Sequence, residues 1–402
     1  MRIRKEMRMP KYILAPDSFK GTLTSEEVSE ILEEEIRKAK PDAEIVSLPV
    51  ADGGEGTVDA FFAALSNAGK RPERIRRQVI GPLGGLVSAD YLIFREKKAS
   101  YRDPGETFTA VIEMAATAGL PLARSLGETN PAVTTTYGTG QLILDALARG
   151  CTKIIVGLGG SATTDGGCGV ADALGIRFYT ADGERFTPVG GDLSEIARIE
   201  TAGRNPLLAN AEIVCMCDVD NPLTGERGAA YVFGPQKGAD PAMVCDLDAG
   251  LGHLAAVVTK TKGLKKGKEN LPGAGAAGGM GYGMTVFLGA KLKSGIDTVL
   301  DLVGFDATLK GASCVLTGEG KFDSQSVHGK VVSGVGKRAK KKNVPVIVVC
   351  GIEGGDVTED DLAANNIRAV YATSKKPRPF AEIRRTAKDD LRKTAAEIAE
   401  TL

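Results

Sequence analysis

The amino-acid sequence predicts an α/β protein composed of two α/β domains. Short apolar runs repeatedly open into glycine-rich polar loops, and a helical pattern follows most of these loops. The arrangement occurs near both ends of the chain, while the pattern between them differs. With 402 residues, the chain is also long enough for two domains that each bury a core. We therefore expect one βαβ domain made of both chain ends, with a second domain inserted into it.

Composition excludes several classes of protein. Lys plus Arg and Asp plus Glu both number 51, and this balance argues against a general binder of nucleic acid or membrane surfaces. The chain has two histidines and seven scattered cysteines, most of them in or beside apolar runs, which is typical of reduced thiols in the cytoplasm. The basic start MRIRKEMRMP lacks the apolar run of a secretory signal. We expect a soluble, cytoplasmic protein.

The first loop follows the apolar run Tyr12–Ala15. A capping box formed by Thr24 and Glu27 then predicts a helix that presents an apolar face and stops at Pro41. Since the loop lies at the carboxyl end of a strand, it is where α/β sheets bind ligands. It offers an acceptor, a hydroxyl and a cation, from Asp17, Ser18 and Lys20. An ordinary capped turn is the alternative, and we favour the functional interpretation.

A second acidic loop follows the apolar run Ile45–Val50. It contains Asp52 and Glu55 among three glycines, and a helix is predicted after it. These carboxylates could bind a cation or accept a proton, or they could merely favour a helix N-terminus. Because the arrangement repeats that of the first loop, we favour function.

The richest glycine loop lies within Lys153–Gly169, KIIVGLGGSATTDGGCG. Glycines let backbone N–H groups approach an anion closely, and the hydroxyls and carboxylate interleaved with them suit a phosphate and its metal. A tight turn is the plain alternative. A dinucleotide fingerprint is the second, because Gly157, Gly159 and Ala162 fit G-x-G-x-x-A. Three further glycines stand where that fingerprint needs a helix, so nicotinamide binding is only the runner-up.

Later loops repeat these features. Asp218 follows the apolar run 212–217, and Lys237 lies in a turn before a helix. A G-x-G-x-x-G pattern includes Gly275 and Gly278, but no strand precedes it, so only a glycine-rich phosphate loop is expected there. The loop after the apolar run 313–316 contributes four more candidates, Gly318, Glu319, Asp323 and Lys330.

The domain boundaries follow from a change of pattern. From Leu86 to about Tyr101 the sequence is typical of antiparallel strands, and the βαβ pattern returns after Ala290. We therefore expect one discontinuous domain from residues 1–82 and 290–402, with residues 83–289 inserted into it.

Eight stretches, taken together, resemble the bacterial type I glycerate kinase family. They are APDSFKGTLTSEE, PVADGGEGT, TTTYGTGQLILDAL, GLGGSATTDGGCG, CDVDNPLTG, VFGPQKGA, PGAGAAGGMG and LTGEGKFDSQSVHGK. The resemblance implies ATP-dependent phosphorylation of D-glycerate to 2-phosphoglycerate with Mg²⁺, and a flavodoxin-like discontinuous domain. The sequence departs from the family pattern at Thr164, where Asn is usual, and at Lys321 and Phe322, where Arg and Leu are commoner.

Phosphoryl transfer requires positioned phosphates, a metal, cations and a proton acceptor. We assign the catalytic group to Asp17, Ser18, Lys20, Asp52, Asp218 and Asp323. The residues expected to bind ATP are Gly159, Gly160, Ser161, Lys237, Gly275, Gly278, Gly318 and Lys330. Asp165 and Glu319 are the expected metal ligands. A kinase of another small hydroxy acid, a non-catalytic binder of nucleotide or organic acid, and a nucleotide-binding oxidoreductase are the alternatives.

Overall fold

A computed structural model describes residues 9–19, 21–50, 53–54, 56–97, 105–327, 330–376 and 378–402. Two of the predicted site residues, Lys20 and Asp52, lie outside these ranges, as does Glu55. The chain divides into two compact units. Unit 1 comprises Met1–Asp52, Asp59–Lys70 and Ile296–Leu402, and unit 2 comprises Gly53–Val58 and Arg71–Gly295.

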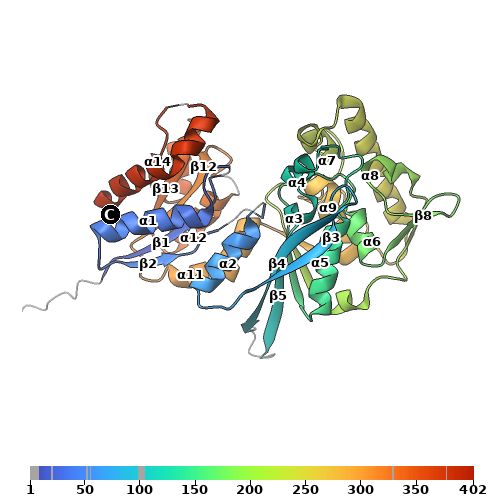
Figure 1. The fold of residues 1–402 in the computed structure, drawn as a ribbon, viewed down its shortest axis with the longest axis horizontal. Coiled ribbons are helices and arrows are strands. Elements are labelled where there is room, and N and C mark those ends of the chain that lie inside the picture. Colours follow the sequence, from blue (N-terminus) through green and yellow to red (C-terminus); the bar gives the residue numbers. More distant parts are fainter. Residues whose placement is uncertain are drawn as a thin grey trace, which may run out of the picture. The chain divides into compact units, whose positions relative to one another are not determined.

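Unit 1 is built on a five-stranded, all-parallel sheet with the order β14-β13-β12-β1-β2 (Figure 1). Counted along the chain, this is the 2-1-3-4-5 order of flavodoxin-like sheets, whose ligand crevice lies outside the carboxyl ends of the first and third strands. Those strands are β1 and β12 here. The elements are β1 (Lys11–Pro16), α1 (Ser25–Ala39), β2 (Glu44–Ser47), α2 (Thr57–Asn67), α10 (Gly295–Leu302), α11 (Phe305–Thr308), β12 (Cys314–Phe322), α12 (Val331–Lys341), β13 (Val346–Glu353), α13 (Glu359–Ala364), β14 (Ile367–Ala372) and α14 (Phe380–Thr401).

Helix α1 illustrates how local sequence forms these elements. The Thr24 hydroxyl accepts a hydrogen bond from the Glu27 amide at 3.1 Å, and the Glu27 carboxylate accepts one from the Thr24 amide at 3.0 Å. The predicted capping box is therefore confirmed. The apolar face of α1 packs with α14 on the sheet, and Figure 1 shows the two helices side by side. An ion pair of 2.7 Å between Lys388 and Glu27 also joins them.

Unit 2 contains a six-stranded mixed sheet with the order β11-β10-β6-β5-β4-β3 and a small three-stranded sheet, β8-β7-β9. The first four strands of the larger sheet are parallel, and β4 pairs antiparallel with both β3 and β5. The strands are β3 (Glu73–Ile80), β4 (Leu86–Lys97), β5 (Glu106–Glu113), β6 (Lys153–Gly157), β7 (Arg177–Tyr179), β8 (Arg185–Phe186), β9 (Arg198–Glu200), β10 (Glu212–Met216) and β11 (Lys291–Lys293).

The helices of unit 2 surround these sheets. The α-helices are α3 (Ala115–Ala118), α4 (Leu120–Ser125), α5 (Tyr137–Ala148), α6 (Cys168–Ala173), α7 (Ala229–Phe233), α8 (Pro241–Lys260) and α9 (Ala276–Leu288), and the 3₁₀ helices are η1 (Gly190–Glu195), η2 (Pro206–Asn210) and η3 (Pro235–Lys237). Among the described residues, only α8 is long and apolar enough to cross a membrane by length and composition. Because core helices of soluble proteins pass the same test, this is weak evidence for a membrane span.

The bounds of the two units differ from the predicted domain bounds of 82/83 and 289/290. Residues 71–82 belong to unit 2 because β3 pairs along its whole length with β4, with Glu73 opposite Ile93. Residues 290–295 also belong to unit 2, because β11 extends the sheet beside β10. Strand pairing, which the sequence pattern does not reveal, decides these two differences, and residues 53–58 also belong to unit 2.

Candidate functional site

The carboxyl ends of β1 and β12 lie next to each other in unit 1 and carry several predicted residues. The Asp17 amide donates a hydrogen bond of 2.8 Å to the Gly318 carbonyl, which joins the two strand ends. The Asp17 carboxylate in turn accepts one from the Ser18 amide at 2.7 Å, and only 7% of Asp17 is exposed. The sheet therefore holds the Asp17 backbone at its carboxyl edge, where flavodoxin-like sheets bind ligands.

Asp323 follows β12 at the same edge. Its carboxylate forms an ion pair of 3.0 Å with Lys321 and accepts a hydrogen bond of 3.1 Å from the Gln325 amide. Burial alone would raise the pKa of Asp323, but these contacts, with the charge of Lys330, hold it below its ordinary value. Asp323 therefore stays ionised at neutral pH. Glu319, half-buried, lies on the same strand in register with Cys350.

Gly318 has a packing role in this structure. A Cβ atom on Gly318 would lie 1.8 Å from the Val349 carbonyl oxygen of the neighbouring strand. The residue lets β12 and β13 approach closely, and its own carbonyl accepts from Asp17. Its assignment to ATP binding stays a prediction without support from these contacts.

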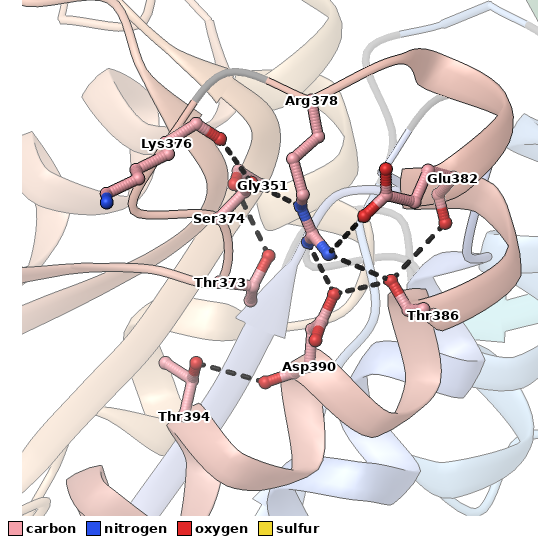
Figure 2. Close-up of polar contacts among 9 residues, drawn as sticks. All are labelled: Gly351, Thr373, Ser374, Lys376, Arg378, Glu382, Thr386, Asp390 and Thr394. Carbon is pink, nitrogen blue, oxygen red and sulfur yellow. Dashed lines mark hydrogen bonds and ion pairs between the residues drawn. The ribbon is translucent and has the colours of Figure 1, made fainter.

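The segment after β14 is anchored at this edge by a network around Arg378 (Figure 2). The Arg378 guanidinium donates hydrogen bonds to Asp390 at 2.6 Å and to Ser374 at 3.2 Å. The Ser374 amide donates to the Gly351 carbonyl at 2.9 Å, where β13 continues toward the ligand-binding edge. The network ties the start of α14 to the strand ends. Sequence reasoning missed it because Gly351 precedes Ser374 by 23 positions and Asp390 follows Arg378 by 12, so the members share no local pattern.

In unit 2, Asp165 anchors the glycine loop that follows β6. Its carboxylate accepts hydrogen bonds from the Thr136 amide and hydroxyl at 2.8 and 2.7 Å, and from the Gly167 and Gly169 amides at 3.0 and 3.2 Å. The side chain is fully buried, and burial raises its pKa, although these hydrogen bonds act in the opposite direction. Four protein donors occupy the oxygens that a metal would need. The contacts therefore favour a structural role over the predicted metal-binding one.

The exposed part of the loop is at Gly160. The Gly159 amide donates to the Gly53 carbonyl at 3.1 Å, so it is not available to a ligand. The amides of Gly160 and Ser161, by contrast, have no acceptor in the described part of the chain. Gly160 has a φ of 74° and is exposed. Two successive free amides, one of them on a glycine with a left-handed backbone, can together bind an anion.

Lys237 lies beneath this arrangement rather than on its surface. Its side chain is 2% exposed, and its Nζ donates hydrogen bonds of 2.9 Å to the Ser161 hydroxyl and 2.7 Å to the Thr163 carbonyl. Burial lowers the pKa of Lys237 to about 7, against a raising effect of the charge of Asp165. The hydroxyls of Thr163 and Thr164 are also buried and have no hydrogen-bond partner among the residues that the structure describes.

Gly275 and Gly278 pack against neighbouring backbone. A Cβ atom would lie 2.2 Å from the Pro222 carbonyl oxygen at Gly275, and 1.9 Å from the Thr163 carbonyl oxygen at Gly278. The Gly275 amide donates to the Asn221 carbonyl at 2.9 Å. Gly278 therefore supports the loop after β6, whereas Gly275 packs against the segment 221–222, and direct phosphate contacts by either glycine stay a prediction.

Two further carboxylates of unit 2 bind backbone amides. Asp218, predicted as catalytic, accepts hydrogen bonds from the Ser294 hydroxyl at 3.0 Å and the Gly295 amide at 2.8 Å, at the start of α10. Glu113 accepts from the amides of Gly56 and Val58, both at 3.2 Å. Sequence reasoning did not single out Glu113, although it directly follows an apolar run, which is the signal that identified Asp218.

Comparisons with known proteins identify the family. A model of the glycerate kinase family matches residues 12–402. The chain belongs to the glycerate kinase family. Glycerate 2-kinase of Escherichia coli K12 is 43% identical over 392 residues, which is 98% of each chain. Glycerate kinase of Bacillus subtilis 168 is 42% identical over 98% of this chain and 97% of its own. A crystal structure from Salmonella typhimurium LT2, provisionally named glycerate kinase 2, has a TM-score of 0.81 and 39% identity, with 98% of both chains covered.

The departures from the glycerate kinase pattern now have a structural context. Thr164 replaces the usual Asn, and its buried hydroxyl has no partner in the described part of the chain. Lys321 replaces the usual Arg and keeps an ion pair with Asp323, although it cannot form the two parallel hydrogen bonds that a guanidinium offers. Among the described residues, no group of three or more His, Cys, Asp or Glu could hold a metal ion.

Proposed function

We propose that this chain transfers the γ-phosphoryl group of ATP to the 2-hydroxyl of D-glycerate, giving 2-phosphoglycerate and ADP. The observation that carries the proposal is the 43% identity, over 98% of both chains, to a protein named glycerate 2-kinase. The free amides of Gly160 and Ser161 support it, since they offer hydrogen bonds to phosphate oxygens. We also propose that the protein is a soluble, cytoplasmic enzyme.

The proposed reaction uses positioning and charge. The glycerate O2 attacks the γ-phosphorus, the bond to the oxygen that bridges the β- and γ-phosphorus breaks, and the electron pair leaves with ADP. The hydroxyl proton passes to a carboxylate, for which Asp17 and Asp323 are the described candidates in unit 1. Asp323 suits this task because its lowered pKa keeps it unprotonated at neutral pH. The predicted roles of Lys20, Asp52 and Asp218 remain untested.

Magnesium fits the donor chemistry of the chain. Mg²⁺ is usually held by one or two carboxylates together with substrate phosphates, so a cage of three protein ligands is not required. Glu319, in the C-terminal half of β12, is the residue that we propose to hold it, which leaves Asp323 free to accept the proton. When bound, the ion would neutralise charge on the phosphates. Asp165 fits less well, because protein donors occupy its oxygens.

A coupled assay tests the proposal. Purified protein is supplied with ATP, Mg²⁺ and D-glycerate, and ADP release is measured. The product is then offered to enolase, which converts 2-phosphoglycerate but not 3-phosphoglycerate unless phosphoglycerate mutase is added. We expect enolase to convert the product without added mutase. Tartronate and glycerol serve as competing acceptors, because a kinase of another hydroxy acid is the second candidate. No turnover of glycerate, or faster turnover of tartronate, would contradict the proposal.

A further inference from the structure

Lys237 is fully buried, which is unusual for a lysine and requires a compensating interaction. Burying an ammonium group away from water is costly unless hydrogen bonds or an opposite charge compensate it. Among the described residues, its Nζ has two hydrogen-bond acceptors, the Ser161 hydroxyl and the Thr163 carbonyl, and neither is a carboxylate. The positive charge therefore lacks an anion in direct contact.

The two acceptors both belong to the glycine loop. The contact with the Thr163 carbonyl holds the loop backbone. Gly278, at the start of α9, packs against the same carbonyl. The contact with Ser161 has a different consequence. Its hydroxyl oxygen accepts a hydrogen bond of 2.9 Å from the Lys237 Nζ, so its own O–H bond must point elsewhere.

The Ser161 hydroxyl proton has no acceptor in the described part of the chain. Its neighbour Gly160 is exposed, and the amides of both residues are free. Ser161 is only 8% exposed, but its amide and its hydroxyl are both donors without an acceptor among the described residues, directly beside the exposed Gly160. A hydroxyl that accepts a hydrogen bond from an ammonium group is also a stronger donor, because hydrogen bonds in a chain polarise one another.

We infer that Lys237 is a positioning residue that acts through Ser161: it orients and polarises the Ser161 hydroxyl, which donates a hydrogen bond to an anionic oxygen of the bound substrate. Lys237 itself does not touch the ligand, unlike the direct cation that its sequence position predicted. The inference rests on the proposed function. The anionic oxygen belongs either to a phosphate of ATP or to the carboxylate of glycerate.

Binding measurements on the parent and five variants test this relay. Affinity for a non-hydrolysable ATP analogue with Mg²⁺, and separately for D-glycerate, is measured by calorimetry for the parent, Lys237→Met, Ser161→Ala and the double variant. Lys237→Gln is included because it keeps a neutral donor and is more readily accommodated if the methionine variant fails to fold. Lys260→Met is the matched control, since Lys260 is exposed at the end of α8 in the same unit.

Lys237→Met and Ser161→Ala should each weaken the binding of one of the two ligands by about tenfold. The affinity of the double variant for that ligand should lie within about threefold of that of Lys237→Met, because both changes remove the same interaction. The ligand that weakens identifies the source of the anion. The affinity of Lys237→Gln for that ligand should lie between those of the parent and Ser161→Ala. In the variants, the KM for that ligand should rise by a larger factor than kcat falls.

Two results would overturn the inference: unchanged affinity for both ligands in folded Lys237 variants, or losses that simply add in the double variant. Failure of the proposed function is seen separately, as absence of glycerate turnover by the parent protein.

Discussion

Replacing Lys237 by methionine should change how the stability of the protein depends on pH. In the unfolded chain this lysine is exposed to water, with an ordinary pKa of 10.5, whereas burial lowers its pKa to about 7 in the folded protein. Between these two values the unfolded state binds more protons than the folded state. The free energy of unfolding of the parent should therefore rise with pH in this window, while the penalty for burying the charge is fully present below about pH 7.

The magnitude follows from the same two values. A group that gains one proton on unfolding contributes about 1.4 kcal/mol per pH unit, and Lys237 is half-titrated near pH 7. Between pH 7 and pH 9 the parent should gain about 2 kcal/mol relative to Lys237→Met, as an order of magnitude. The absolute difference at one pH is less informative, because the variant also leaves the Ser161 hydroxyl and the Thr163 carbonyl without a donor, at about 1–3 kcal/mol each.

Urea denaturation at pH 7, 8 and 9 measures this difference. Far-UV circular dichroism is the suitable signal, because the chain has no tryptophan. Other titrating groups cancel when the parent and the variant are compared, and Lys260→Met should show no pH-dependent difference. If the stability gap between the parent and Lys237→Met stays constant from pH 7 to pH 9, the buried lysine does not titrate there and the reasoning fails.

Two further substitutions test the glycine loop. Asp165→Asn should lower the free energy of unfolding of the ligand-free protein by about 1–3 kcal/mol, because an amide cannot satisfy four donors; weaker Mg²⁺ binding with unchanged stability would instead indicate a metal ligand. Gly160→Ala should cost about 1–2 kcal/mol because of its left-handed backbone, and it should also weaken ATP binding. Gly150→Ala is its control, with a φ of 87° and open space around it, so an equal loss of ATP affinity in both would refute a specific role for Gly160.

The sequence predicted best what is decided locally. The capping box at Thr24 and Glu27 depends on residues three positions apart, and the structure contains it. The role of Asp165 was not predictable in the same way, because Thr136, which supplies two of its four donors, precedes it by 29 positions. The burial of Lys237 depends on acceptors more than 70 positions away. Loop composition thus predicts which loops form the candidate site, whereas contacts between distant segments determine which polar groups remain available to a ligand.

The pairing of β1 with β12 has a consequence for synthesis of the protein on the ribosome. Tyr12 lies opposite Cys314, so the first strand to be made waits for about 300 residues before its central partner exists. Meanwhile β1 can pair only with β2, and two strands are too few for an independently stable sheet. Most of unit 2 is one continuous stretch, Arg71–Gly295, and can fold as soon as it emerges. We therefore expect unit 2 to fold first, while the apolar face of the early strands stays accessible to chaperones until the C-terminal strands arrive.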